Sequence, residues 1–195
     1  MELNQSKTRQ NLMRAFAGET QAWARYTFAA QSVRTQGFPV LERLFRYTGD
    51  QEKEHAGILW GLLKTAGTES VSAPGDYPVD LQGDALSLLR AAAAHEQAEA
   101  EEIYPAFAAE AEREGFGDIA LRFRQLAAVE GVHGERFRRL AEAMEQGSLF
   151  CSDGPVPWIC LNCGHVLTGT EPPAACPVCA HEQGFFVRLE LSPFQ

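Results

Sequence analysis

Two motifs of identical spacing place a glutamate three residues before a histidine: Glu52 with His55, and Glu130 with His133. Residues three positions apart lie on one face of an α-helix, so each motif directs a carboxylate and an imidazole to the same side. Carboxylate oxygens combined with imidazole nitrogens suit iron or manganese. One such motif arises easily by chance, but two within apolar helical stretches indicate a metal site.

The segments that must position these motifs read as four long helices. Glycine and proline residues interrupt the helical pattern at 37–39, 67–78, 115–117 and 147. Short connections make the first two helices antiparallel, and likewise the last two. The connection at 67–81 is long enough to cross the bundle, which predicts an all-α, ferritin-like four-helix bundle.

Glutamate or histidine interrupts the apolar face of every predicted helix. Apolar residues recur at steps of three and four, as expected of faces directed at a bundle core. The interruptions repeat, because Glu19 precedes Glu52 by 33 residues and Glu96 precedes Glu130 by 34. The chain therefore reads as two helical hairpins, each with one glutamate and one Glu-x-x-His motif.

Most glutamates on helices are solvated surface charges. Several ionised carboxylates facing one another in a core would instead need cations between them. One glutamate from each of two helices and a Glu-x-x-His motif from each of the other two is the ligand set of dinuclear carboxylate bundles. The predicted ligands are Glu19, Glu52, His55, Glu96, Glu130 and His133, with Glu99 as a seventh. We expect Glu52 and Glu130 to bridge the two metals.

Four residues near these ligands carry weaker expectations. Tyr26 and Tyr104 lie one to two helical turns from a ligand and are either core tyrosines or groups that assist the site. His95 points off the apolar face, so we expect it at the surface. Pro105 should kink the third helix directly after its ligands.

A second metal site is predicted near the carboxyl end. Cys160-Leu-Asn-Cys163 and Cys176-Pro-Val-Cys179 are separated by twelve residues, a strong metal-binding signature. Four thiolates suit both a structural zinc ion and a redox-active iron ion. A one-electron centre fused to a dinuclear centre makes functional sense, so the context favours iron. No function is assigned to Cys151.

The composition supports two domains and narrows the class of protein. The formal net charge is −9, which argues against general nucleic-acid binding. The sequence has no apolar run long enough to span a membrane and no signal-peptide core near its start, so we expect a cytoplasmic protein. All five cysteines and six of the ten prolines fall after residue 150. The predicted division is a bundle at 1–147, a linker at 148–156 and a cysteine domain at 157–195.

The chain resembles the rubrerythrin family over nearly its whole length. The matching motifs are Glu19 with Tyr26, Glu52-x-x-His55-Ala, Glu96-x-x-Glu99 running into Tyr104-Pro105, Glu130-x-x-His133, Trp158-x-Cys160-x-x-Cys163-Gly164, and Cys176-Pro177-x-Cys179. The second glutamate of the third helix separates this family from plainer di-iron bundles, and Glu99 supplies it here.

The resemblance implies a di-iron domain, a rubredoxin-like domain with one iron, and reduction of hydrogen peroxide to water. Electrons would come from a separate reductase. The resemblance also implies catalytic roles for Glu99 and His55, between which one iron moves, with Tyr26 and Tyr104 next to the ligands. A homodimer, head-to-tail in arrangement, is implied as well.

Two other functions remain open at this point. The same dinuclear ligand set could serve a ferroxidase or an oxidase in iron handling. The protein could also be a non-enzymatic metal-binding module with a zinc ribbon, and zinc could occupy the cysteine site in a purified sample. Peroxidase chemistry is the main prediction.

Overall fold

The computed structural model describes residues 2–79 and 83–193 of the 195-residue chain. The helices are α1 (Lys7–Thr35), α2 (Pro39–Thr65), α3 (Ala85–Ala98), a π-helical segment (Glu99–Ile103), α4 (Tyr104–Glu114) and α5 (Gly117–Glu145). The strands are β1 (Val156–Cys160), β2 (Val166–Gly169) and β3 (Phe186–Arg188). None of the helices in these ranges combines the length and the apolar character needed to cross a membrane.

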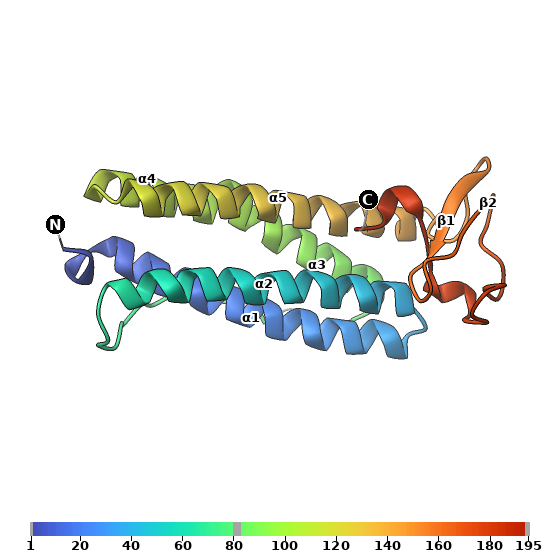
Figure 1. The fold of residues 1–195 in the computed structure, drawn as a ribbon, viewed down its shortest axis with the longest axis horizontal. Helices are drawn as coiled ribbons and strands as arrows, with labels where there is room; N and C mark the ends of the chain where they lie inside the picture. Colours follow the sequence, from blue (N-terminus) through green and yellow to red (C-terminus); the bar gives the residue numbers. More distant parts are fainter. Residues whose placement is uncertain (1, 80–82, 194–195) are drawn as a thin grey trace.

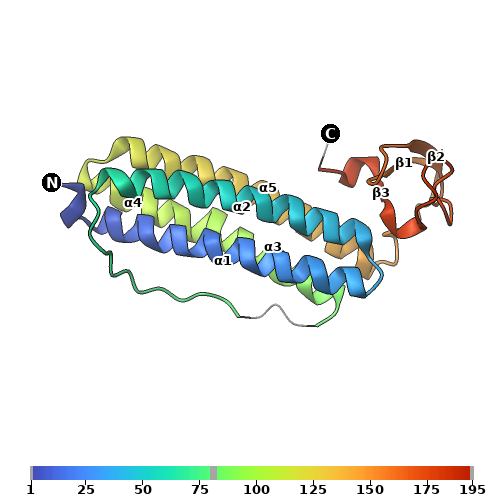
Figure 2. The same cartoon turned by 60° about the horizontal axis from the view of Figure 1, so that its bottom comes forward.

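The helices form two antiparallel hairpins, as the connection lengths predicted (Figure 1). One hairpin is α1 with α2, and the other pairs α5 with the continuous helix made by α3, the π-helical segment and α4. The chain leaves α2 at one end of the bundle and returns along α1 to begin α3 at the other end (Figure 2). The connection predicted at 67–81 is this crossover, although its positions 80 and 81 lie outside the described residues.

Helix ends are fixed by side-chain caps and by glycine. The hydroxyl of Ser6 accepts the Arg9 N–H at 3.0 Å at the start of α1. A carboxylate oxygen of Asp84 accepts the Ser87 N–H at 2.8 Å at the start of α3. Both caps satisfy N–H groups that a helix leaves without an internal partner. Gly115 ends α4 with a φ of 88°, a left-handed conformation that favours glycine.

A polar layer divides the bundle core into two apolar clusters. One cluster includes Tyr26, Phe45 and Phe137 and lies toward the α1–α2 turn. The other includes Phe107 and Phe123 and lies toward the opposite end. Each buried aromatic ring contributes about 1.5–3 kcal/mol of transfer free energy, and these clusters hold the helices that carry the polar layer.

The kink expected at Pro105 takes a different form. The chain widens into the π-helical segment Glu99–Ile103 immediately before the proline, and the Tyr104 N–H donates to the Glu99 carbonyl five residues earlier. Proline has no N–H to continue the α-helical pattern, and one wide turn accommodates this loss. The irregular turn therefore begins at a predicted ligand.

The three strands form one antiparallel sheet in the order β2-β1-β3. The fully buried Trp158 anchors this domain, and its indole N–H donates to the Gly169 carbonyl at 2.9 Å. The domain packs against the end of the bundle, where the Arg43 guanidinium on α2 donates to the Leu161 carbonyl at 2.6 Å and to Asn162 Oδ1 at 2.9 Å. The fold is thus a four-helix bundle with a small β domain at one end (Figure 1).

Candidate metal centres

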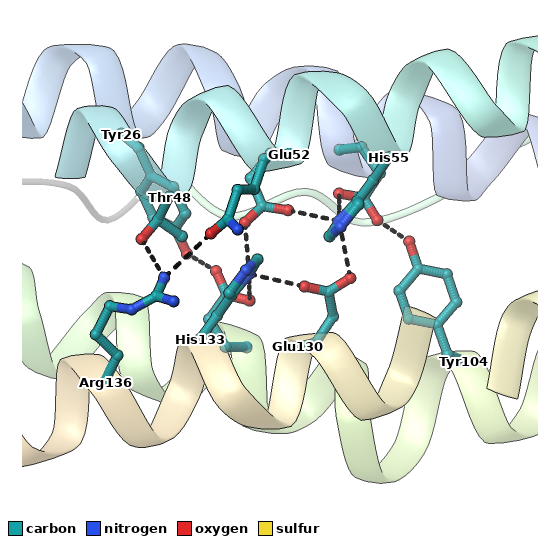
Figure 3. Close-up of polar contacts among 11 residues, drawn as sticks. Tyr26, Thr48, Glu52, His55, Tyr104, Glu130, His133 and Arg136 are labelled. Atoms are coloured by element: carbon teal, nitrogen blue, oxygen red, sulfur yellow. Dashed lines mark hydrogen bonds and ion pairs between the residues drawn. The ribbon is translucent and has the colours of Figure 1, made fainter. Parts of the chain in front are cut away.

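The predicted carboxylates and imidazoles meet in the polar layer of the bundle (Figure 3). They form two groups whose ligand atoms lie within 4.8 Å of one another: Glu19, Glu52, His55 and Glu130 in the first, and Glu52, Glu96, Glu130 and His133 in the second. Glu52 and Glu130 belong to both groups. A carboxylate shared by two neighbouring groups has the position of a bridging ligand.

Each imidazole faces three carboxylates. Nδ1 of His55 lies 3.1 Å from Glu130 Oε1, 3.2 Å from Glu52 Oε2 and 3.5 Å from Glu19 Oε2. Nδ1 of His133 lies 2.8 Å from Glu52 Oε1, 3.0 Å from Glu130 Oε2 and 3.5 Å from Glu96 Oε2. The two arrangements repeat each other, as the two-hairpin repeat in the sequence predicted.

Several of these polar atoms are buried and lie close to one another, at the distances given above, but form no hydrogen bond of good geometry among the described residues. They include both carboxylate oxygens of Glu52 and Glu130, one oxygen each of Glu19 and Glu96, and Nδ1 of both histidines. Leaving a buried polar atom unpaired costs about 1–3 kcal/mol, and more for a charged group. Cations between the oxygens and nitrogens would satisfy all of them at once, so the donor set fits a pair of metal ions.

The pKa values of the ligand side chains also favour a pair of metal ions in the polar layer. Burial, reinforced by neighbouring carboxylates, raises the pKa of Glu19 well above its usual range and that of Glu96 to about 7. Burial also opposes ionisation of Glu52, but its contacts to His133 and His55 lower its pKa to about 2. Burial disfavours the charged form of His55, yet the surrounding carboxylates raise its pKa to about 12. The layer therefore demands positive charge, supplied by protons or by metal ions.

Glu99 stands apart from the other predicted ligands. It belongs to neither four-residue group, is half-buried, and lines a cavity of about 110 Å³ together with Tyr104. Burial raises its pKa well above the usual range. Its Oε1 lies 3.8 Å from the point that a Cβ on Gly18 would occupy. Glu99 thus lies at the wall between the polar layer and the cavity.

Both predicted tyrosines contact ligands of the opposite hairpin. The Tyr26 hydroxyl on α1 donates to Glu96 on α3, and the Tyr104 hydroxyl on α4 donates to Glu19 on α1. Burial raises the pKa of Tyr26 well above its usual range, so the phenol stays protonated. Each tyrosine fixes one carboxylate oxygen and leaves the other free to bind a cation.

Two arginines near the polar layer, Arg136 and Arg25, were not predicted from the sequence to lie there. Arg136 Nη1 donates to Thr48 Oγ1 at 2.8 Å, and its position three residues after His133 was the available clue (Figure 3). Arg25 Nη1 lies 2.5 Å from His95 Nδ1. His95 is therefore half-buried at the cavity rather than at the surface as expected, because the guanidinium extends from α1 to meet it.

The four cysteines predicted as ligands meet in the β domain. Their sulfur atoms all lie within 4.8 Å of one another, with Cys160 and Cys179 at 3.8 Å and Cys163 and Cys176 at 3.6 Å. Sulfur atoms bonded at about 2.3 Å to one tetrahedral metal ion would be separated by about 3.8 Å. A disulfide would bring two sulfur atoms to about 2.05 Å. The geometry fits a four-thiolate metal site, and Cys151 lies exposed outside it.

Comparison with known proteins covers both domains. The rubrerythrin family model matches residues 10–141, and the model of the rubrerythrin rubredoxin-like domain matches residues 158–187. A rubrerythrin of Clostridium perfringens is 41% identical over 185 residues, covering 94% of this chain and 95% of the relative. A rubrerythrin of Porphyromonas gingivalis is 42% identical over 181 residues, covering 93% and 89%.

Solved structures of nigerythrin are also similar. The mixed-valence state aligns with a TM-score of 0.62 at 28% identity, and the fully reduced, all-ferrous state with a TM-score of 0.59 at 32% identity. Each alignment covers 93% of this chain and 86% of the nigerythrin chain. The predicted fold class, a ferritin-like bundle followed by a rubredoxin-like domain, is confirmed. The chain belongs to the rubrerythrin family.

Proposed function

We propose that this protein is a non-haem di-iron peroxidase that reduces hydrogen peroxide to water. The observation that carries the proposal is a buried layer of carboxylates and imidazoles that adjoins a small cavity through Glu99 and Tyr104. Membership of a family whose members are generally oxidoreductases supports it. The test begins with metal analysis and a visible spectrum of the purified protein, because an oxidised four-thiolate iron site is strongly coloured and a zinc site is colourless.

The proposed ligands follow the two groups in the layer. Glu19 and His55 would hold one iron, Glu96 and His133 the other, and the shared carboxylates of Glu52 and Glu130 would bridge them. Glu99 would be a further ligand from the cavity side. The all-ferrous state described for nigerythrin supports iron rather than manganese. Cys160, Cys163, Cys176 and Cys179 would hold a third iron, for which zinc can substitute in a purified sample.

Cleavage of the O–O bond to give two waters consumes two electrons and two protons, and a pair of ferrous ions bound in the layer would supply both electrons. Side chains of this protein would transfer the two protons. The Tyr104 hydroxyl donates to Glu19, and Tyr104 also lines the cavity, so this phenol would pass a proton to a leaving oxygen. Glu99 places a carboxyl group at the cavity wall, and burial raises its pKa, which favours its protonated form in the absence of metal.

The β domain is the proposed entry point for electrons from a separate reductase. It lies beyond one end of the bundle, and the apolar cluster containing Phe45 and Phe137 separates it from the polar layer of the same chain (Figure 1). Transfer between two chains would avoid this separation. We therefore propose a homodimer in which the chains lie head to tail, and sedimentation of the intact protein tests the dimer.

A ferroxidase or oxidase is the second candidate function, because the same carboxylate-rich layer suits iron that reacts with dioxygen. The polar side chains among the residues that line the cavity, which include Arg25 and Glu99, favour peroxide. A preference of the reduced protein for dioxygen would support the second candidate. Zinc in the cysteine site together with no reaction toward either oxidant would support a non-enzymatic metal-binding module.

A further inference from the structure

The two-hairpin repeat is broken one helical turn beyond each Glu-x-x-His motif. Arg136 follows His133 by three residues on α5, whereas the equivalent position of α2, three residues after His55, is Ile58. Residues three apart lie on one face of a helix, so each of these side chains is a neighbour of a proposed ligand. One end of the polar layer therefore carries a cation, and the other end carries an apolar side chain.

The residue that Arg136 contacts breaks the repeat in the same way. Arg136 Nη1 donates to Thr48 Oγ1 at 2.8 Å, and Thr48 precedes Glu52 by four residues on α2. The equivalent residue of α5, four residues before Glu130, is Leu126. A hydroxyl and a guanidinium thus meet at one end of the layer, whereas the equivalent positions at the other end are both apolar.

Contacts with three consecutive turns and faces of α2 side chains hold the Arg136 guanidinium in place. Besides the bond to Thr48, Nη1 donates to Gln51 Oε1 at 3.3 Å, and the guanidinium carbon lies 5.2 Å from the centre of the Tyr47 ring. Thr48 is fully buried and Arg136 is half-buried, so water screens this charge less than it screens a surface charge. The layer therefore has a fixed positive charge beside it.

This charge lies closer to the His133 end of the layer than to the His55 end. Arg136 and His133 are three residues apart on α5, which is about 4.5 Å of helical rise. Thr48, which accepts the bond from the guanidinium, is seven residues from His55 on α2, about 10.5 Å of rise. Figure 3 shows Arg136 and Thr48 together at the His133 end, with Tyr104 at the other end.

The guanidinium also interacts electrostatically with carboxylates of the layer. Burial lowers the pKa of Arg136, whereas the negative charges of Glu96 and Glu52 favour its charged form. Both carboxylates belong to the group of clustered ligands that contains His133. Oxidation of a ferrous ion adds one positive charge, and a fixed cation nearby opposes that addition.

We propose that Arg136 makes the two irons unequal, so that the pair gains and loses electrons one at a time. The inference rests on the proposed function. The charge opposes oxidation of the iron held by Glu96 and His133 more than oxidation of the iron held by Glu19 and His55. It thereby stabilises the half-oxidised pair in which only the second of these irons is ferric. Such a pair suits reduction by the four-cysteine centre, which delivers single electrons.

The test measures the comproportionation constant of the full-length, iron-loaded protein, which compares the half-oxidised pair with the fully reduced and fully oxidised pairs. Stepwise anaerobic reduction is followed by electron paramagnetic resonance, because the half-oxidised pair, unlike the other two states of the pair, has an odd number of electrons. Arg136→Met removes the charge, and the constant should fall roughly 3- to 10-fold, where tenfold is about 59 mV for a one-electron couple. Arg136→Gln, a second neutral variant, should give the same fall.

Two further variants separate the charge of Arg136 from its contacts. Arg136→Lys keeps the charge but loses the planar guanidinium, and its constant should stay within about twofold of wild type. Arg139→Met removes an equal charge from a half-buried side chain three residues further along α5. Its constant should also stay within about twofold, because this position is more distant from the layer.

Four results would overturn the role of Arg136. They are an unchanged constant in both neutral variants, an equal fall in Arg136→Lys, an equal fall in Arg139→Met, and a wild-type pair that changes only in two-electron steps. The second result would assign the effect to the contacts of the guanidinium, and the third to the net charge of the protein. Oxidation by dioxygen as fast as by peroxide would overturn the proposed function instead, and the comproportionation constants would still decide the role of Arg136.

Discussion

The Tyr104 hydroxyl donates a hydrogen bond to Glu19, a carboxylate of the opposite hairpin. Tyr26 makes the reciprocal contact to Glu96, so the two hairpins exchange equivalent bonds across the polar layer. The environments of the two phenols nevertheless differ. Tyr104 lines the cavity with Glu99, whereas Tyr26 packs among the aromatic rings of Phe45 and Phe137.

This difference predicts unequal effects of removing each hydroxyl. Tyr104→Phe should lower peroxide turnover by roughly 10-fold or more, because general acid catalysis by a positioned group contributes at least that much. Tyr26→Phe should lower it by less than about threefold, since its hydroxyl does not reach the cavity. Steady-state peroxidase assays at matched iron content measure both. A larger loss in Tyr26→Phe would contradict the proton role given to Tyr104.

Glu99→Ala should slow peroxide turnover by about 10- to 100-fold while the visible spectrum of the cysteine centre stays intact. The side chain lies at the cavity wall, and its removal leaves the four-sulfur site untouched. Glu101→Ala is the matched control, because Glu101 is exposed in the same π-helical segment. Turnover that equals wild type in Glu99→Ala would remove Glu99 from the proposed mechanism.

The sequence predicted the bundle, its crossover and the grouped carboxylates because helical spacing maps directly onto helix faces. Glu52 and His55 share a face by geometry, and the apolar residues on the same face predicted their burial. The π-helical turn at Glu99 could not be predicted, since the pattern assumes a constant helical period. The contact of Arg25 with His95 joins residues 70 positions apart. No periodicity within one helix reports such a pair.

Glu114→Ala should destabilise the protein by about 1 kcal/mol at pH 7, the usual cost of losing a helix cap. The Glu114 carboxylate, at the end of α4, accepts the N–H groups of Lys7 and Thr8 at 3.0 and 2.8 Å and bonds the Thr8 hydroxyl. Urea unfolding measures the difference. Glu112→Ala, which breaks only an exposed ion pair with Arg124, should cost less than about 0.5 kcal/mol.

The contribution of Glu114 should also depend on pH. Partial burial opposes its ionisation, but the Thr8 hydroxyl and the Thr8 and Lys7 N–H groups outweigh burial and hold the pKa of Glu114 below its usual value. A lowered pKa in the folded state means that the stabilisation is complete above the unfolded-state pKa and disappears as pH falls through the folded-state value. The difference in the free energy of unfolding between wild type and Glu114→Ala should therefore shrink to zero as the pH falls into the acid range. A difference in the free energy of unfolding that grows at acid pH would contradict the role of Glu114 as a helix cap.

Cys176→Ser should separate electron delivery from peroxide chemistry. Loss of one of the four clustered thiolates should abolish the colour of the oxidised cysteine centre. A single oxidation of chemically reduced protein by peroxide should proceed at the wild-type rate, whereas continuous turnover with a reductase should stop. Cys151→Ser, at an exposed cysteine outside the cluster, should leave both unchanged. Undiminished continuous turnover in Cys176→Ser would place electron entry elsewhere.

In the proposed function, the buried carboxylate layer holds iron that reduces peroxide. The most direct measurement reduces the iron-loaded protein anaerobically and mixes it rapidly with hydrogen peroxide or with dioxygen at equal concentration. Oxidation by peroxide should be at least about 10-fold faster than oxidation by dioxygen. Oxidation by dioxygen at an equal or higher rate would contradict the peroxidase and favour an oxidase.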